Sequence, residues 1–198
     1  MDKQYLVGQL KMLADQYEIC IDEDILGEIV SMASFRVIPR GELMASTGDD
    51  TKMVGIVLSG VARSYYIDSE GNDITRNFAA AGGFCMDDGL FGYSERVCMW
   101  EALEETTVMF LETGKVRKLI SENESIKDTW ILLLEKGMRY KIYRENGFLV
   151  ENATERYIHF KKLFPELSGR VPQKHIASYL GIKPESLSRI RGALKEKE

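Results

Sequence analysis

The chain has 198 residues, 44% of them apolar and 29% charged, which is enough for one large domain or for a domain followed by a smaller one. No apolar run approaches the roughly 20 residues that a membrane helix needs, and the charged N-terminal segment is not a signal peptide, so we expect a cytoplasmic protein without a membrane partner. The three cysteines form no CxxC pair, which argues against a disulfide framework and against an iron–sulfur cluster.

The charge is distributed unevenly along the chain. Its net value is −5, but residues 1–151 carry 16 basic and 26 acidic side chains, whereas residues 152–198 carry 10 basic and 5 acidic ones. A basic segment attached to an acidic body is compatible with nucleic-acid binding. A run of charge is also common on an ordinary solvated surface, so this observation needs support from motifs.

The N-terminal part changes its pattern near residue 34. Apolar residues recur at helical spacing over residues 3–33, which predicts one or two helices. From Phe35 to Leu111, short apolar stretches alternate with turn-forming clusters, which is typical of an antiparallel β-roll. The best hairpin signal is "YYIDSEGNDITRNF" (residues 65–78), in which Gly71 or Asn72 can take a positive φ at the turn.

A long helix is predicted from about Glu124 to Phe148, and it has two apolar stripes. The first contains Ile126, Trp130, Leu133 and Tyr140, and the second contains Ile131, Leu134, Met138 and Ile142. One stripe can pack on the chain's own roll and leave the other for a second copy, and we assign the dimer contact to the first stripe. The alternative is a helix buried within a monomer. A shorter helix follows, ending before Pro165.

The C-terminal segment predicts two short helices around a glycine. The first runs over Gln173–Leu180, Gly181 turns the chain, and the second begins at Pro184 and runs to about Lys195. Apolar residues at helical spacing give the helices a shared core: Ile176, Leu180, Ile182, Leu187 and Ile190. The outer face of the second helix carries Glu185, Ser186, Ser188, Arg189 and Arg191. Such groups suit a DNA major groove, although an ordinary helical hairpin has the same outline.

Three stretches together resemble the Crp/Fnr family of bacterial transcription regulators: "RVPQKHIASYLGIKPESLSRIR", "RSYYIDSEGNDIT" and "ALEETTVMFL". The resemblance implies an α+β chain with three parts. Residues 1–123 form a cyclic-nucleotide-binding-like antiparallel roll (a cupin-like double-stranded β-helix) with flanking helices, 124–150 a dimerisation helix, and 151–198 an all-α helix-turn-helix domain. The expected partners are double-stranded DNA with a palindromic promoter site, a second copy of the chain, and RNA polymerase.

The resemblance also implies roles for individual residues of the C-terminal segment. Glu185 and Arg189 match the base-reading positions of the family, with Ser186 beside them, and Gln173 and Lys174 match phosphate contacts. Many members have arginine where this chain has Pro184, a loss for which Arg191 can partly compensate. The sequence ends at "KEKE", so we expect no β-hairpin wing after the second helix. His175 is expected to face solvent or phosphate.

The phosphate cassette of nucleotide-binding members is altered in this chain. Met86 stands where the cassette has glycine, Asp87 where it has glutamate, Arg96 at the arginine, and Val97 where it has a hydroxyl. Losing one charge-assisted hydrogen bond costs about 1.5–3 kcal/mol, so we expect no tight cAMP binding. Arg96 can equally be a surface residue. Met86, Met99 and Trp100 can line an apolar pocket for another effector, or simply form the core of the roll.

The roll can also have a function other than binding a small effector. The chain can be a regulator without an effector, or it can sense thiol oxidation through Cys85 and Cys98. A member of a different class, an enzyme or metal-binding module on a cupin-like roll, needs clustered histidines, and residues 1–158 contain none. We therefore predict no catalytic residue, no metal and no cofactor.

Overall fold

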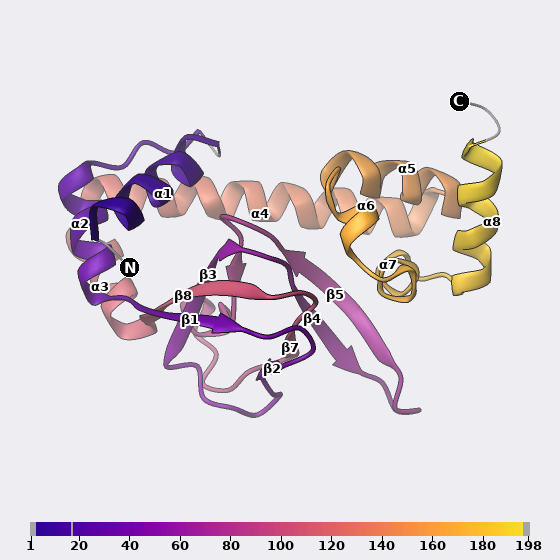
Figure 1. Cartoon of the computed structure of the whole chain (residues 1–198), viewed down its shortest axis with the longest axis horizontal. Coiled ribbons are helices and arrows are strands. Elements are labelled where there is room, and N and C mark those ends of the chain that lie inside the picture. The colour runs from indigo at the N-terminus through magenta and orange to yellow at the C-terminus, as the bar shows by residue number, and fades with distance from the viewer. Residues whose placement is uncertain (1–2, 17, 196–198) are drawn as a thin grey trace. The chain divides into compact units, whose positions relative to one another are not determined.

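The structure is a computed structural model that describes residues 3–16 and 18–195 (Figure 1). The residues after Lys195, which include most of the terminal "KEKE", lie outside the described residues. The chain divides into two compact units, Met1–Tyr65 with Asn77–Leu134, and Tyr66–Arg76 with Glu135–Glu198. The helix α4 (Glu124–Val150) contributes to both units, and the tip of one hairpin belongs to the second. The boundaries at residues 123 and 150 stay predictions.

The strands form two antiparallel four-stranded sheets, which confirms the predicted roll. The first sheet has the order β1-β8-β3-β6 and consists of β1 (Ser34–Ile38), β8 (Thr106–Glu112), β3 (Met53–Ser59) and β6 (Phe84–Cys85). The second has the order β2-β7-β4-β5 and consists of β2 (Leu43–Ala45), β7 (Met99–Ala102), β4 (Ala62–Ile67) and β5 (Asp73–Ala79).

The core of the roll is built from inward-facing residues of both sheets. Val57 pairs with Val108 across β3 and β8, and Trp100 pairs with Ser64 across β7 and β4. The side chain of Trp100 is 1% exposed and packs among small and branched apolar residues. Alternation along the strands places the other set of side chains on the outer face of the first sheet.

Helices cover that outer face. α1 (Lys3–Gln16) and α2 (Glu23–Met32) place Leu6 and Leu26 against Val54 and Met109 of the sheet. A short 3-10 helix, η1 (Asp88–Phe91), and α3 (Thr113–Glu122) complete the first unit before α4 begins. The α+β class and the helix–roll–helix order are thereby confirmed. No helix in the described ranges is both long enough and apolar enough to cross a membrane.

The β4–β5 hairpin turns as its sequence predicts. The carboxylate of Asp68 accepts hydrogen bonds from the backbone N–H groups of Glu70 and Asn72, each at 2.9 Å. Gly71 takes the positive φ, at +84°, and Asn72 does not. The aspartate therefore caps the turn while glycine supplies the left-handed backbone.

The long helix α4 exposes the opposite stripe from the one that we assigned to a dimer. Ile126 is only 7% exposed, the ring of Trp130 lies 5.9 Å from that of Phe91, and Tyr140 is half-buried. The second stripe is exposed, with Met138 and Ile142 each at 58%. Periodicity reveals two stripes but not which of them the chain itself covers, and this burial favours the second stripe over Ile126, Trp130, Leu133 and Tyr140 as the face left for a partner.

Four helices follow the hairpin tip and the second half of α4 in the second unit: α5 (Ala153–Leu163), α6 (Leu167–Arg170), α7 (Gln173–Leu180) and α8 (Pro184–Lys195). Asn152 begins α5 with a capping box, because its side chain accepts from the backbone N–H groups of Thr154 and Glu155 while the Glu155 carboxylate accepts from the Asn152 N–H. This cap fixes where α4 ends and α5 begins.

Candidate functional site

The two C-terminal helices have the predicted bounds. Gly181 takes the left-handed conformation with φ +66°, and its N–H donates to the carbonyl of Ser178 at 3.0 Å. The side chains of Ile176, Ala177 and Leu187 are fully buried between the helices. Ala177 allows the close approach of the helices, because no larger side chain intervenes. The turn and the shared core are confirmed.

The outer face of α8 presents the polar residues that the sequence singled out. Glu185, Ser188 and Arg189 are exposed, and Ser186 is half-buried with its hydroxyl 3.5 Å from the Arg189 guanidinium. Gln173 and Lys174 are exposed at the start of α7. Because both helices rest on a buried core, the outer face is presented on a rigid support.

One sequence-based expectation in this segment needs correction, and the place of one further residue is now defined. His175 is 4% exposed and lies in the interior of the second unit, so it faces neither solvent nor a phosphate. Arg191 is half-buried and lies at the side of α8, where it lines a groove of about 210 Å³ with Gln173, Ser188 and Lys195. The periodicity of two such short helices, of eight and twelve residues, cannot tell which polar residues the neighbouring helices cover.

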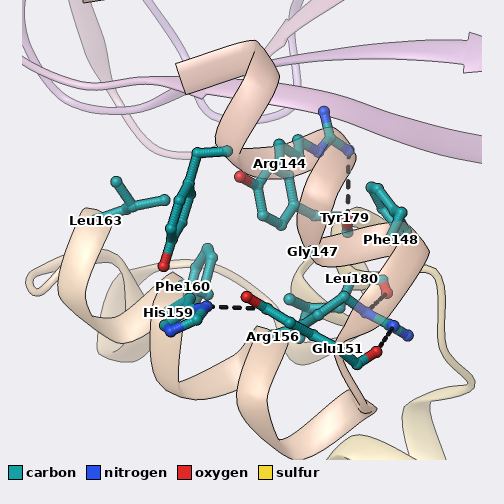
Figure 2. A pocket seen from close by; sticks show the side chains of 11 residues that line it. Arg144, Gly147, Phe148, Glu151, Arg156, His159, Phe160, Leu163, Tyr179 and Leu180 are labelled. Atoms are coloured by element: carbon teal, nitrogen blue, oxygen red, sulfur yellow. Dashed lines mark hydrogen bonds and ion pairs between the residues drawn. The ribbon is translucent and has the colours of Figure 1, made fainter. Parts of the chain in front are cut away.

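Behind α7, three helices of the second unit line a small hollow of about 30 Å³ (Figure 2). The guanidinium of Arg144 on α4 lies 4.3 Å from the ring of Tyr179 and donates to the Tyr179 carbonyl at 3.2 Å. Arg156 on α5 donates to the carbonyl of Leu180 at 3.1 Å. These arginines satisfy carbonyls at the C-terminal end of α7, where helix carbonyls lack intrahelical donors.

The junction of α4 and α5 is tied to the same hollow. The ring nitrogen Nδ1 of His159 lies 2.9 Å from the Glu151 carboxylate, and Arg156 donates to the Glu151 carbonyl at 2.7 Å (Figure 2). The support of α7 is therefore a network of charged groups around aromatic rings. Sequence reasoning missed Arg144, Arg156 and Glu151, because arginine and glutamate on long helices carry no local signal of burial.

The tip of the β4–β5 hairpin contacts α7 within the second unit. The Ser178 hydroxyl accepts from the N–H of Thr75 at 2.8 Å and donates to the carbonyl of Asp73 at 3.1 Å. Arg144 adds a hydrogen bond to the carbonyl of Arg76 and a longer one of 3.5 Å to that of Thr75. The first helix of the pair is thus bonded to a strand end more than 100 positions earlier in the chain.

In the sensor roll, Arg96 is a buried residue and not a surface one. Its side chain is 2% exposed, and its guanidinium donates to the backbone carbonyls of Met86 and Met53 and lies 3.5 Å from the buried carboxylate of Asp88. Met86, in the glycine position of the cassette, has φ +57°, a conformation that glycine adopts far more easily. The arginine of the altered cassette is thus engaged by the chain itself.

The other predicted pocket residues divide between core and cavity. Trp100 belongs to the core, and Val97 packs against that core. The sulfur of Met99 accepts a hydrogen bond from the N–H of Thr47 at 3.3 Å, and Asp87 is half-buried. Met86 lines a cavity of about 190 Å³ together with Ile38, Met44, Met53 and Phe110, and with Arg36 among its polar members. Of the predicted pocket residues, Met86 lines this cavity, together with two methionines that the sequence did not single out.

The cysteines and the acidic groups offer little reactive chemistry. Cys85 and Cys98 are fully buried, and burial raises the pKa of the Cys85 thiol far above its usual range, the nearby Asp87 charge adding to the effect. Cys20 is exposed. Across the described ranges, no three His, Cys, Asp or Glu side chains are grouped closely enough to hold a metal ion.

Comparisons with known proteins agree with this geometry. Residues 35–123 match the family model of the cyclic nucleotide-binding domain. No curated protein matches the chain in sequence. Among solved structures, FixK2 from Bradyrhizobium japonicum is similar with a TM-score of 0.73 and 20% identity, over 83% of this chain and 85% of that one.

Two further structures are similar over most of their length. The c-di-GMP-responsive global regulator CLP of Xanthomonas campestris has a TM-score of 0.71 and 14% identity, over 89% of this chain and 93% of that one. A protein from Eubacterium rectale, described as a transcriptional regulator of the Crp/Fnr family, has a TM-score of 0.65 and 15% identity, over 89% and 85%. At these identities the likeness establishes a shared fold.

Proposed function

Because the chain contains a cyclic nucleotide-binding domain over residues 35–123 and has the fold of the Crp/Fnr regulators, we propose that it is a dimeric, sequence-specific DNA-binding transcriptional regulator and not an enzyme. The observation that carries the proposal is the outer face of α8. It presents Glu185 and Arg189 to solvent on a helix whose other face is fully buried at Leu187. Arginine binds the acceptor pair of guanine bidentately, and carboxylates accept from cytosine.

The exposed stripe of α4 is the proposed dimer contact. One face of α4 carries four exposed apolar residues: Ile131, Leu134, Met138 and Ile142. Leu149 lies on the same face, because it follows Ile131 by about five helical turns. Two such helices packed side by side bury this stripe and relate two copies of α8 by a two-fold axis. The copies then meet major grooves about 34 Å apart on a palindromic site. A regulator of this kind acts on promoters in the cytoplasm together with RNA polymerase.

The roll is proposed to bind neither cAMP nor cGMP tightly. Arg96 already donates to two backbone carbonyls, which compete with a cyclic phosphate for its guanidinium, and Trp100 fills the interior between the sheets. The cavity beside Met44, Met53 and Met86 suits a small apolar effector. A regulator without any effector is the second candidate, favoured by the closed interior at Trp100.

The DNA-binding proposal is tested with a duplex selected from a random library by the wild-type protein. Arg189→Ala is expected to bind this duplex and a random one with nearly equal affinity, while weak salt-dependent binding persists. Arg117→Ala, which removes an exposed arginine from α3, is the matched control and should keep the wild-type preference. Unchanged preference in Arg189→Ala would sink the assignment of α8.

Effector binding is tested by calorimetric titration of the purified protein. We expect no heat of binding from cAMP or cGMP at micromolar concentrations. The Xanthomonas campestris regulator is described as responsive to c-di-GMP, so this cyclic dinucleotide is included. Micromolar affinity for cAMP or cGMP would show that Arg96 exchanges its carbonyl partners for phosphate, and would overturn the proposal for the roll.

A further inference from the structure

The cavity beside Met86 in the roll has an apolar floor under a polar rim. Its volume is about 190 Å³. Ile38, Met86 and Phe110 are buried and form the floor, and Met44 and Met53 are half-buried and form the walls. An apolar cavity of about 150 Å³ accepts a molecule as large as benzene, so this cavity has room for an apolar group of several carbon atoms.

The rim presents a cation beside an anion, Arg36 and Glu42. Their nearest nitrogen and oxygen atoms lie 3.4 Å apart, and the two side chains are 64% and 42% exposed. An ion pair with this exposure is weak, so both groups are available to a ligand. Ser34 is a further polar residue of the rim, on the same face of β1 as Arg36 because alternate residues of a strand share a face. The Arg36 guanidinium lies 6.0 Å from the Phe110 ring, which places it over the floor.

Arg96, the arginine of the altered cassette, fixes the walls of this cavity. Its own side chain is 2% exposed and does not line the cavity, but its guanidinium donates to the backbone carbonyls of Met53 and Met86. The rim is fixed at Glu42, whose backbone carbonyl accepts from the N–H of Ala102 at 3.0 Å. The cavity is therefore preformed, as ligand sites usually are.

We propose that this cavity binds a free α-amino acid with an apolar side chain. The carboxylate of the ligand accepts hydrogen bonds from Arg36 and from the Ser34 hydroxyl, its ammonium group donates to Glu42, and its side chain packs on the apolar floor. This inference rests on the proposed function, in which the cavity takes a small effector, and it names the chemical class of that effector.

The paired charges of the rim favour an amino acid over simpler ligands. An apolar acid would bring its carboxylate close to Glu42, and an apolar amine would bring its ammonium group close to Arg36, so each meets a like charge. A wholly apolar molecule would cover both rim charges without a hydrogen bond to either. An α-amino acid carries opposite charges on either side of a single carbon atom, which matches the neighbouring cation and anion. The flexible methionines of the walls adapt to side chains of different shape, which favours a class of amino acids over one member.

The test is calorimetric titration of the full-length protein with L-leucine, L-methionine and L-phenylalanine in the absence of DNA. We expect binding at micromolar to millimolar concentrations, and none by glycine, which has no side chain for the floor. For leucine, 4-methylpentanoate lacks the ammonium group and isoamylamine lacks the carboxylate. Each should bind about tenfold more weakly than leucine or worse, because one charge-assisted hydrogen bond is lost.

Two variants separate the roles of the rim residues. In Arg36→Gln, leucine should lose its advantage over isoamylamine, and in Glu42→Gln it should lose its advantage over 4-methylpentanoate. Arg40→Gln is the matched control, because Arg40 is an exposed arginine near the rim that does not line the cavity, and it should keep the wild-type affinity. All three positions are exposed, and urea unfolding checks that the variants fold as the wild type does.

The outcomes distinguish this inference from the proposed function. Absence of binding by all three amino acids would overturn the inference, and so would 4-methylpentanoate or isoamylamine binding as tightly as leucine. Wild-type affinity in both Arg36→Gln and Glu42→Gln would place the amino acid elsewhere and reject the cavity. Amino-acid binding by a protein that shows no preference between the selected and random duplexes would support the cavity site and overturn the proposed DNA-binding function. Sequence preference without amino-acid binding would do the reverse.

Discussion

The phenolic oxygens of Tyr140 and Tyr179 lie 2.8 Å apart and form a hydrogen bond between α4 and α7. Arg144 lies over the Tyr179 ring and also bonds the backbone of the hairpin tip. The first helix of the DNA-binding pair is thereby tied to the same helix that carries the proposed dimer stripe. Any movement of α4 along its axis must either break this bond or move α7 with it.

The tyrosine pair is expected to stabilise the second unit measurably. Tyr140→Phe and Tyr179→Phe should each lower the free energy of unfolding by about 1 kcal/mol or more, since each removes the hydrogen bond between the two hydroxyls and Tyr140→Phe also removes a bond with Arg144. The double variant should lose less than the sum of the two, because both single variants remove the same bond. Urea unfolding of the four proteins gives the coupling energy, and strict additivity would show that the bond does not form in solution.

Alkaline pH should weaken this pair. Burial is the main cause that raises the pKa of both Tyr140 and Tyr179 above the usual value near 10. Above about pH 10 the unfolded chain releases these protons while the folded chain retains them, so stability falls as pH rises and is unaffected by these groups below that value. Unfolding free energies measured from about pH 8 to about pH 11 should decline less steeply in the double phenylalanine variant.

Two glycines should respond to alanine with opposite signs. A Cβ at Gly55 would lie 2.5 Å from the Cys85 sulfur and 2.8 Å from a methyl group of Val108, so Gly55→Ala should destabilise by about 1–3 kcal/mol. A Cβ at Gly27, inside α2, meets nothing within 4 Å, so Gly27→Ala should stabilise by about 0.5–1 kcal/mol. Thermal unfolding of both variants checks the contrast, and equal shifts would contradict the packing of β3 on β6.

The native protein should expose a single reactive thiol. Cys20 is exposed, whereas Cys85 and Cys98 are fully buried, and burial raises the pKa of the Cys85 thiol so that little thiolate forms. Ellman's reagent should titrate one group quickly in the native state and three after unfolding. Fast reaction of any thiol in the folded Cys20→Ser variant would support the thiol-sensor interpretation.

The exposed stripe of α4 can be tested by introducing charge. Met138→Glu places two carboxylates, one from each protomer, at the centre of the proposed dimer contact. Because these charges would be buried close together, the dimer dissociation constant should rise on the order of 100-fold. Lys141→Glu, on the flank of the same helix, should leave it within a few-fold of wild type. Sedimentation equilibrium measures both, and a wild-type constant for Met138→Glu would move the dimer contact elsewhere.

Local signals in the sequence determined the elements of this protein. Turn residues and alternation are short-range, so the turn at Gly71 was predicted from the sequence, and the helices on either side of Gly181 were predicted with their observed bounds. Residue identity alone also determined that the cassette departs from the phosphate-binding pattern at Met86 and Val97. These features depend on neighbours within a few positions along the chain.

Only the tertiary structure decided which side chains are covered and what they bond. The stripe of α4 that contacts the chain's own residues, the burial of Arg96 under two carbonyls, and the bond from Thr75 to Ser178 all join residues far apart in sequence. A stripe or an arginine has the same local pattern whether it is buried or free. Its environment is set by the packing of distant elements, and that packing places Arg191 of α8 in a groove with Gln173 of α7.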